Sequence, residues 1–264
     1  MKTLFVFCFI IGVLCLAWAF LVEPKMLVVQ KYKISVPKLK GLKVVFMSDF
    51  HVGPNDEERL KKIVKKANEQ NADLVLLGGD FVNGHKGNHS LPIEIIAKNL
   101  GELKAQLGIV SVLGNHDWFV FGEKISAELA KNNITVLRDE NKALSFNGLK
   151  FHVAGLEDPV TQRFNIEKAL DGVKNPVILL THTPDVYPQI SNAVDITLAG
   201  HTHGGQVKVP FFGAILVPSK FGRRYAEGFF NEDNKKMIVT KGLGTSLLPM
   251  RFNCPPEIVV IDFE

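Results

Sequence analysis

Residues able to bind a metal ion follow the apolar, strand-like segments of this sequence. They are Asp49, His51, Asp80, Asn115, His116, Asp117, His182, His201 and His203. Because the carboxyl ends of strands in an α/β sheet lie along one edge, we expect these side chains to converge. Carboxylate, amide and imidazole ligands without thiolates suit a divalent cation such as Mn, Fe, Zn or Mg, and not a structural zinc site.

Two short motifs hold pairs of these residues two positions apart. The stretch "AGHTHGGQ" (199–206) carries His201 and His203 between glycines, and "SDFH" (48–51) carries Asp49 and His51. On an extended chain, residues two apart point to the same side. We therefore interpret each pair as one side of a metal site, with the two histidines forming a pincer and the glycines allowing tight turns.

The elements that carry these motifs are short apolar segments separated by amphipathic helices. Expected strands lie at 43–47, 73–77, 108–113, 149–155, 176–180, 194–200, 237–243 and 257–263, and expected helices near 56–70, 92–104 and 122–132. Such a pattern is typical of a buried α/β sheet. We predict one α/β domain over 43–264, a two-sheet β-sandwich flanked by helices, preceded by a linker over 24–42.

The N-terminal segment has a different character. Residues 4–22, "LFVFCFIIGVLCLAWAFLV", are uncharged and long enough to cross a bilayer as a helix. We favour an uncleaved membrane anchor over residues 1–23. A signal peptide cleaved near Ala17-x-Ala19 and a buried core helix are the alternatives. The charges flanking the segment leave its orientation open.

Composition excludes some function classes. A net charge of +4 with scattered lysines does not give the concentrated basic surface of a nucleic-acid-binding protein. The lysines of "RLKKIVKK" (59–66) fall on the solvent side of an amphipathic helix. Three cysteines, two of them in the N-terminal segment, cannot form an intradomain disulfide framework, so they do not define the compartment.

The motifs, taken in order, resemble the calcineurin-like metallophosphoesterase superfamily. The matching stretches are "SDFH", "GGD" (78–80), "GNHD" (114–117), "THTPD" (181–185) and "GHTH" (200–203). Together with "GRRYAEG" (222–228) and "GLGTS" (242–246), they are most similar to the YkuE/YaeI-like branch, whose members are often membrane-tethered. That branch is similar to a bacterial membrane-associated UDP-2,3-diacylglucosamine pyrophosphatase of lipid A biosynthesis.

The resemblance implies two divalent metal ions, with Mn favoured, and a hydroxide bridging them that attacks phosphorus. It assigns Asp49, His51 and His203 to the first ion, Asp80 to both, and Asn115, His182 and His201 to the second. It also implies that His116 stabilises the phosphoryl oxygens or protonates the leaving group. Asp117 would orient the imidazole of His116.

An apolar stretch follows the last histidine motif, and two arginines follow it. Arg223 and Arg224 could bind phosphate oxygens through their guanidinium groups, or they could be ordinary surface residues. The stretch 209–222 is either core or an exposed apolar lip that meets a membrane or an acyl chain.

Other polar residues have simpler interpretations. We expect His85 and His89 in a solvated loop, and His152 in a strand without a role. We expect Asp158 to form a turn.

We conclude from the sequence that the chain is a membrane-anchored phosphohydrolase of the bacterial inner membrane, facing an unspecified side. It would cleave a phosphodiester or pyrophosphate bond of a lipid-linked substrate, with UDP-2,3-diacylglucosamine as the leading candidate and no nucleic acid as partner. A broad-specificity phosphodiesterase of the cell envelope is the alternative enzyme. A catalytically inactive metal-binding scaffold is the alternative of another class.

Overall fold

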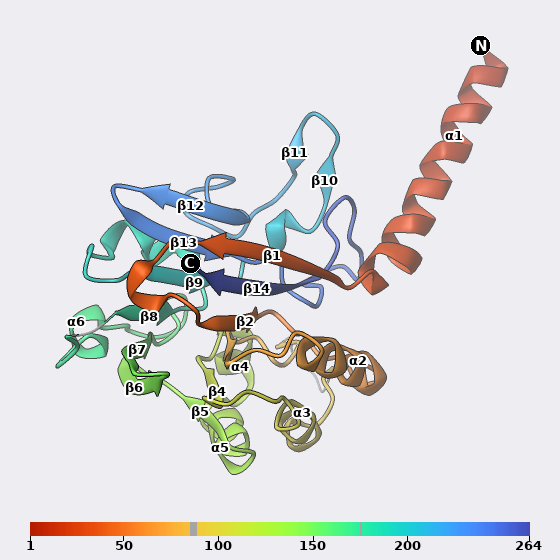
Figure 1. Ribbon diagram of the computed structural model, residues 1–264. Helices are drawn as coiled ribbons and strands as arrows, with labels where there is room; N and C mark the ends of the chain where they lie inside the picture. Colours follow the sequence, from red (N-terminus) through yellow and green to blue (C-terminus); the bar gives the residue numbers. More distant parts are fainter. Residues whose placement is uncertain (85–88, 175) are drawn as a thin grey trace.

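Two six-stranded sheets dominate the fold in the computed structural model, which describes residues 1–84, 89–174 and 176–264 (Figure 1). The strand order is β1-β14-β2-β3-β4-β5 in the first sheet and β12-β13-β9-β8-β7-β6 in the second. A separate two-stranded hairpin is formed by β10 and β11. The predicted α/β architecture with two stacked sheets is confirmed.

The elements have the following bounds. The first sheet contains β1 (Val28–Ile34), β2 (Lys43–Met47), β3 (Leu74–Leu77), β4 (Ile109–Ser111), β5 (Ile134–Val136) and β14 (Glu257–Phe263). The second contains β6 (Glu140–Phe146), β7 (Leu149–Gly155), β8 (Val177–Leu180), β9 (Ile196–Ala199), β12 (Gly228–Glu232) and β13 (Lys235–Val239). The hairpin strands are β10 (Lys208–Val209) and β11 (Gly213–Ala214). The α-helices are α1 (Lys2–Ala17), α2 (Glu57–Asn68), α3 (Ile93–Leu100), α4 (Asn115–Val120), α5 (Gly122–Lys131) and α6 (Ile166–Ala169). Shorter helical segments are η1 (Trp18–Val22), η2 (Glu23–Lys25), η3 (Pro37–Leu39), η4 (Pro184–Gln189) and η5 (His203–Gly205).

Side chains that alternate along each strand fill two different cores. In β2, Val44 and Phe46 belong to the cluster between the sheets, whereas Val45 and Met47 belong to the cluster under the helices. Because central strands are buried on both faces, they read as unbroken apolar runs in the sequence. The predicted strands at 43–47 and 176–180, which correspond to β2 and β8, are runs of this kind.

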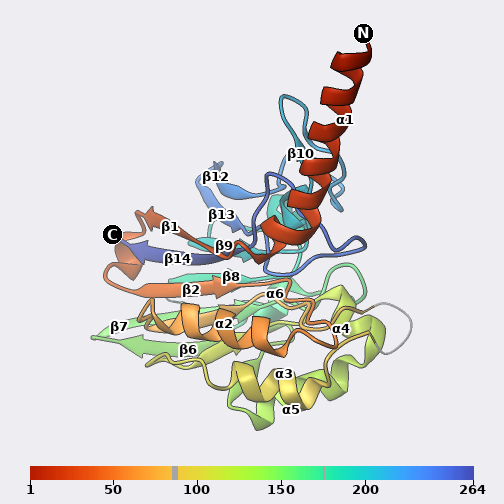
Figure 2. The same ribbon diagram turned by 90° about the vertical axis from the view of Figure 1, so that its right-hand side faces the viewer.

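The helices cover the outer faces of the sheets. In Figures 1 and 2, α2, α3 and α5 form a layer on the outer side of the first sheet. They bury apolar residues such as Leu60, Ile96 and Leu129 in one cluster with the sheet. On the outer face of the second sheet, Ala169 of α6 and Val186 of η4 share a cluster with that sheet.

Strand direction brings the polar motifs together. β2, β3 and β4 are parallel to one another in the first sheet, and β7, β8 and β9 are parallel in the second. The residues that follow β2, β3, β4, β8 and β9 are the predicted metal-binding motifs. The centre therefore forms where the carboxyl ends of two sheets meet.

The segment 24–42, which we expected to be a linker, contributes a strand. β1 pairs in parallel with β14 over its whole length, and Leu39 and Leu42 are buried in the core between the sheets. Its partner strand is the last one in the chain, so no local pattern indicates this pairing. The segment is thus part of the folded domain.

The N-terminal helix leaves the domain. Residues Lys2–Lys25 span 24 residues with a mean hydropathy of 2.9, and no other helix among the described residues is as suited in length and composition to cross a membrane. A signal sequence would meet the same criteria. In both views α1 projects away from the sheets, and it buries none of its residues (Figures 1 and 2).

The base of this helix, in contrast, is packed into the domain. Ala19 is only 1% exposed, and its carbonyl accepts a hydrogen bond of 2.9 Å from the amide of Arg251. The buried carboxylate of Glu23 accepts hydrogen bonds from the Cys254 amide and the Trp18 indole. The helix base and the loop before β14 therefore hold each other in place.

Arg251 organises that loop. The residue is fully buried, and its guanidinium donates hydrogen bonds to the carbonyls of Lys241, Gly242, Gly244 and Cys254. A buried cation that satisfies several carbonyls is strongly stabilising relative to its removal, because those carbonyls would otherwise remain without donors.

Arg251→Met should lower the free energy of unfolding of the full chain by about 3–5 kcal/mol. Urea unfolding in detergent, followed by circular dichroism, measures this. Arg224→Met is the matched control, since Arg224 is exposed and its ion pair with Glu232 is worth about 1 kcal/mol or less. Equal unfolding midpoints for the two variants would contradict the role given to Arg251.

Candidate metal centre

The predicted ligands converge at the carboxyl ends of the strands. Three overlapping groups have ligand atoms within 4.8 Å of one another: Asp49, His51 and His203; His51, Asp80 and His116; and Asp80, His182 and His201. All of these residues are buried or half-buried. Asn115 joins the third group, because its Oδ1 lies 3.1 Å from His182 Nε2.

The first group presents two imidazoles to one point. His51 Nε2 and His203 Nε2 are 3.1 Å apart, and His203 Nε2 lies 3.5 Å from Asp49 Oδ1. Burial lowers the pKa of His51 to about 3 and lowers that of His203 well below its ordinary value. Both rings are therefore neutral at physiological pH, with nitrogen lone pairs available to a cation.

The third group is held from outside by a backbone carbonyl. His182 Nδ1 lies 2.8 Å from the Gly78 carbonyl and donates to it, so Nε2 faces the centre. That Nε2 is 3.2 Å from Asp80 Oδ2 and 3.2 Å from His201 Nδ1. Burial opposes a charge on His182, but the carboxylates of Asp80 and Asp49 outweigh it and hold the pKa well above its usual range.

Asp80 belongs to the third group and also faces His51 of the first group. Its Oδ1 accepts the His116 amide at 2.8 Å, while Oδ2 is 3.2 Å from His182 Nε2 and 3.5 Å from His51 Nε2. Burial favours the neutral acid, yet the attraction of His182 and His51 lowers the pKa of Asp80. The carboxylate is thus ionised and points to both groups.

The residues that follow the strands adopt an unusual backbone conformation. Positive φ angles occur at Asp49 (57°), His51 (40°), Asp80 (55°), His201 (69°) and His203 (52°). Residues other than glycine rarely adopt this left-handed conformation, and it occurs where the surrounding structure imposes it at functional sites. The prediction of an extended chain at these motifs is therefore wrong, although their side chains do reach the centre.

The predicted pincer of His201 and His203 is also wrong. His203 lies with Asp49 and His51, whereas His201 lies with Asp80 and His182. The two histidines therefore serve different groups and do not form one pincer.

Asp117 differs from its expected role. Its Oδ2 accepts the amides of Asp80 and Gly114, and its Oδ1 accepts those of Phe81 and Val82. These bonds hold the loop that carries Asp80 against the start of α4. Asp117 thus positions the backbone around Asp80, because its carboxylate is occupied by amides.

His116 has another partner. Its Nδ1 lies 2.6 Å from the carbonyl of Asn83, and its ring meets that of His51 edge-on, with centroids 4.6 Å apart. The imidazole is half-buried at the margin of the groups formed by His51 and Asp80. It is therefore placed to contact a molecule bound at the centre.

Glycines allow the ligand loops to approach one another. A Cβ at Gly114 would overlap Asp80, and one at Gly200 would overlap Asp49. A Cβ at Gly242 would lie 2.7 Å from that of Asp49. The glycines are therefore needed for close packing of the loops from both sheets.

Sequence reasoning missed the arginines that support these loops. Arg59 donates to the carbonyls of Phe50, His51 and Leu243, and Arg251 binds the loop that includes Gly244. Arg59 lies on α2, whose other basic residues face solvent. The spacing of basic residues along this helix therefore does not distinguish Arg59 from the others.

The two predicted phosphate-binding arginines are held elsewhere. Arg224 pairs with Glu232 at 2.8 Å, and Arg223 Nη1 lies 2.5 Å from the carbonyl of Phe212. Among the described residues, no hydrogen bond or ion pair connects either arginine to the candidate ligands. Both remain exposed.

The remaining polar candidates fit their simpler interpretations where they are described. His152 lies on β7 and contacts Asn141 Oδ1 at 2.8 Å. Asp158 Oδ2 accepts the amide and hydroxyl of Thr161, as expected for a turn. His89 lies in a loop, and His85 lies outside the described residues.

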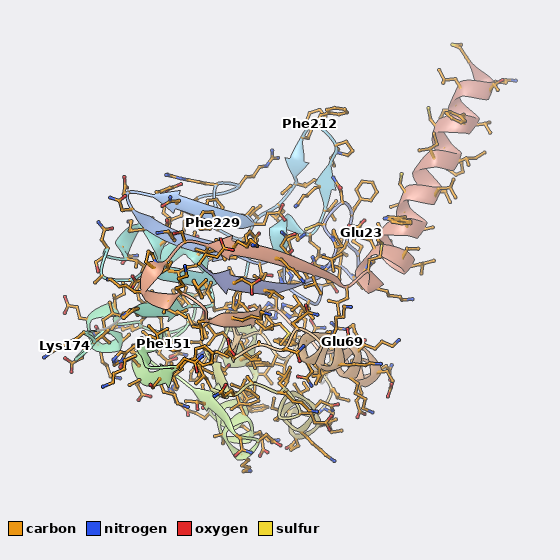
Figure 3. The ribbon with its side chains drawn as sticks, in the orientation of Figure 1. Glu23, Glu69, Phe151, Lys174, Phe212 and Phe229 are labelled. Carbon is orange, nitrogen blue, oxygen red and sulfur yellow. The ribbon has the colours of Figure 1, made fainter. Side chains whose placement is uncertain are left out.

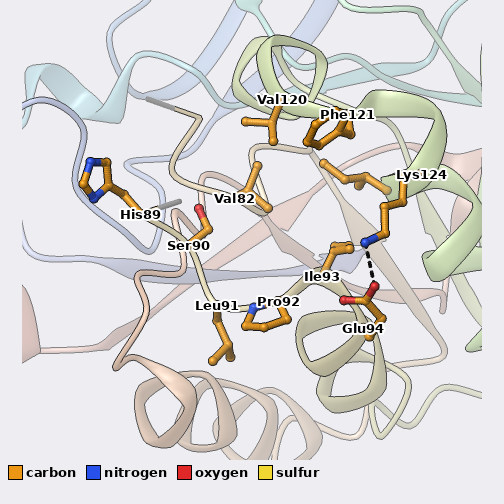
Figure 4. Close-up of a pocket in the computed structure, with 11 residues that line it drawn as sticks. Val82, His89, Ser90, Leu91, Pro92, Ile93, Glu94, Val120, Phe121 and Lys124 are labelled. Atoms are coloured by element: carbon orange, nitrogen blue, oxygen red, sulfur yellow. Dashed lines mark ion pairs between the residues drawn. The ribbon is translucent and has the colours of Figure 1, made fainter. Parts of the chain in front are cut away.

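A cavity of about 250 Å³ lies near the centre but is separate from its ligands (Figure 4). Its walls include Val82, Leu91, Ile93 and Phe121, and an ion pair of 2.7 Å joins Lys124 to Glu94 beside them. No candidate ligand lines it. The cavity is therefore distinct from the candidate metal centre.

The chemistry of the centre fits divalent cations. Neutral imidazoles at His51 and His203 and an ionised carboxylate at Asp80 are protonation states that metal binding requires, whereas His182 would lose its proton on binding. His51 Nε2 and His203 Nε2 lie 3.1 Å apart beside the Asp49 carboxylate, so the two rings direct nitrogen atoms at one point where a cation would fit. The mixed oxygen and nitrogen donors suit Mn, Fe, Zn or Mg.

Comparison with known proteins agrees with this chemistry. The family model described as calcineurin-like phosphoesterase matches residues 42–205. The uncharacterized metallophosphoesterase YkuE of Bacillus subtilis is 32% identical, covering 92% of this chain and 87% of that protein. Phosphodiesterase YaeI of Escherichia coli is 30% identical, covering 83% and 81%.

A further relative is a transmembrane protein with a metallophosphoesterase domain from Danio rerio. It is 30% identical, and the match covers 84% of this chain and 53% of that protein. The family match spans more than half of this sequence and includes the strands and loops that build the centre. The chain therefore belongs to the calcineurin-like phosphoesterase family.

Proposed function

We propose that the protein is a dinuclear-metal-dependent phosphohydrolase that cleaves phosphodiester or pyrophosphate bonds. The observation that carries this proposal is the position of Asp80, whose Oδ2 is 3.2 Å from His182 Nε2 and 3.5 Å from His51 Nε2. A carboxylate between two imidazole groups is the arrangement that two adjacent cations need.

The ligands divide between two ions. Asp49, His51 and His203 would hold one, Asn115, His182 and His201 the other, and Asp80 would bind both. When bound, such ions lower the pKa of a water molecule toward neutrality and stabilise charge on phosphoryl oxygens. Mn is the ion we expect first.

His116 would act on the substrate directly. Its imidazole meets that of His51 edge-on, with centroids 4.6 Å apart, and its ligand atoms group with those of His51 and Asp80. From this position it would carry a proton to the leaving oxygen or bind a phosphoryl oxygen. Asp117 assists only through the backbone, by holding the amides of Asp80 and Gly114.

We further propose that the chain is anchored in the bacterial inner membrane by its N-terminal helix and remains uncleaved. The packing of Ala19 and Glu23 into the domain supports this, since cleavage after Ala19 would sever the buried helix base. A substrate with an acyl chain would then be available beside the enzyme. UDP-2,3-diacylglucosamine is the first candidate, and a broader set of envelope phosphodiesters is the alternative.

Metal content tests the ligand assignment. Purified full-length protein loaded with Mn should hold two ions per chain, measured by plasma mass spectrometry. Asp80→Asn should lower this number, because the shared charge is lost. Asp139→Asn, which alters a buried aspartate outside the three groups, should not. His116→Ala should also keep both ions, and a loss there would make His116 a ligand.

Metal affinity should rise between pH 5 and pH 8. Burial raises the pKa of Asp49 to about 6, so below that pH a proton occupies the ligand and must leave on binding. Affinity should then fall by up to about tenfold per pH unit for this group. The pKa of His182 is also raised, so this ligand too must lose a proton when metal binds, and its contribution likewise makes affinity rise with pH. Calorimetric titration with Mn gives the constants, and a flat profile would contradict this account.

Turnover tests the function. Mn-loaded protein should hydrolyse UDP-2,3-diacylglucosamine in preference to an aryl phosphodiester, and His116→Ala should reduce kcat by about 10²–10⁴-fold. A metal-stripped sample is the control. Turnover of the aryl ester alone would favour the broad phosphodiesterase, while two bound ions without turnover of either would favour the inactive scaffold.

A further inference from the structure

The β10–β11 hairpin exposes large apolar side chains to solvent. Phe212, Ile215 and Leu216 are 65–75% exposed, and Phe211 is fully exposed. In Figures 1 and 2 the hairpin projects from the domain on the same side as α1, and Phe212 stands at its tip in Figure 3. The stretch 209–222, for which core and lip were both open, is therefore largely an exposed lip.

The turn of this hairpin holds an aromatic residue in an unfavourable conformation. Phe211 has φ of 67°, whereas Gly213 provides the other positive φ of the turn at 76°. A bulky residue in the left-handed region costs free energy that glycine or asparagine would avoid. The phenyl ring is fully exposed, so packing within the domain does not offset this cost, and a contact outside the domain would do so.

A second pair of exposed apolar side chains lies in the loop before β14. Leu247 and Leu248 are 75% and 57% exposed. Their loop is joined to Gln206, whose side chain donates to the Leu248 carbonyl and accepts the Ser246 amide, both at 2.8 Å. Gln206 directly follows η5, which carries His203, and it precedes the hairpin in the sequence. Both the hairpin and the Leu247–Leu248 loop are therefore attached to the chain beside the metal centre.

One exposed cation is bonded to the hairpin, and two others are exposed close to it in the sequence or at the helix base. Arg223 donates to the Phe212 carbonyl at 2.5 Å, which places its guanidinium on the hairpin. Lys220 is exposed between the hairpin and Arg223 in the sequence, and Lys25 is exposed at the base of the N-terminal helix. A guanidinium beside an apolar tip is complementary to anionic phospholipid, with the phosphates at the cation and the acyl chains below.

We propose that the hairpin tip and the Leu247–Leu248 loop insert into the same bilayer as α1 and hold the rim of the metal centre at the lipid surface. The proposal rests on the membrane anchoring given under the proposed function and is independent of the catalytic chemistry. It extends that function, because a substrate whose acyl chains stay in the bilayer could present its phosphate to the centre without leaving the membrane.

Fluorescent labels in the full chain test this insertion. Cys254 is buried, so replacing Cys8 and Cys15 with alanine leaves a background without an exposed thiol. The NBD fluorophore is then attached to Phe212→Cys, or to Phe229→Cys as the matched control on β12, which is 40% exposed away from the tip (Figure 3). A third protein keeps native Cys8 to report on α1. Each is reconstituted in phosphatidylethanolamine–phosphatidylglycerol vesicles and quenched by a doxyl phospholipid or by aqueous iodide.

Insertion predicts a blue-shifted label at position 212, with doxyl quenching about threefold stronger than at 229, since interfacial segments sink about 5–10 Å. Iodide should show the reverse order. Doxyl quenching at Cys8 but not at 212 would overturn the hairpin proposal and leave the anchor intact. Absence of doxyl quenching at Cys8 would overturn the anchor and this proposal with it. Shielding of 212 from both quenchers would indicate contact with a second copy of the chain and would also overturn it.

Discussion

A buried negative charge at Asp80 is the constraint to which the rest of the centre is adjusted. Its carboxylate is 1% exposed, with one oxygen bound by the His116 amide and the other facing the imidazoles of His182 and His51. An isolated buried charge would be too costly, so cationic partners must surround it. In the protein alone a proton on His182 supplies part of that charge. Metal ions would supply the remaining positive charge around Asp80. Metal binding would therefore stabilise the folded arrangement of the ligand loops.

The position of that charge follows from the meeting of two sheets. Asp49, after a strand of the first sheet, accepts the amide of His201, after a strand of the second. His182 likewise donates from the second sheet to Gly78 of the first. These bonds lock the two sheets together at their carboxyl ends. Ligand geometry is thus set by strand packing over an apolar core and not by flexible loops, which favours the preorganisation that phosphoryl transfer requires.

Much of this arrangement could be predicted from the sequence, because buried central strands and the polar residues after them leave local signals. The converging ligands and the stacked sheets are examples. What could not be predicted depends on contacts between distant segments. β1 pairs with the last strand, Arg59 and Arg251 support carbonyls far along the chain, and Asp117 binds backbone amides in place of His116. The left-handed turns also left no pattern, since aspartate and histidine at strand ends are compatible with either conformation.

Anomalous diffraction from crystals of the Mn-loaded protein would show whether Asp80 binds two ions. Two anomalous peaks should appear, separated by about 3.5–4 Å. One should lie among Asp49, His51 and His203, the other among Asn115, His182 and His201, with Asp80 between them. A single peak, or peaks away from Asp80, would contradict the account.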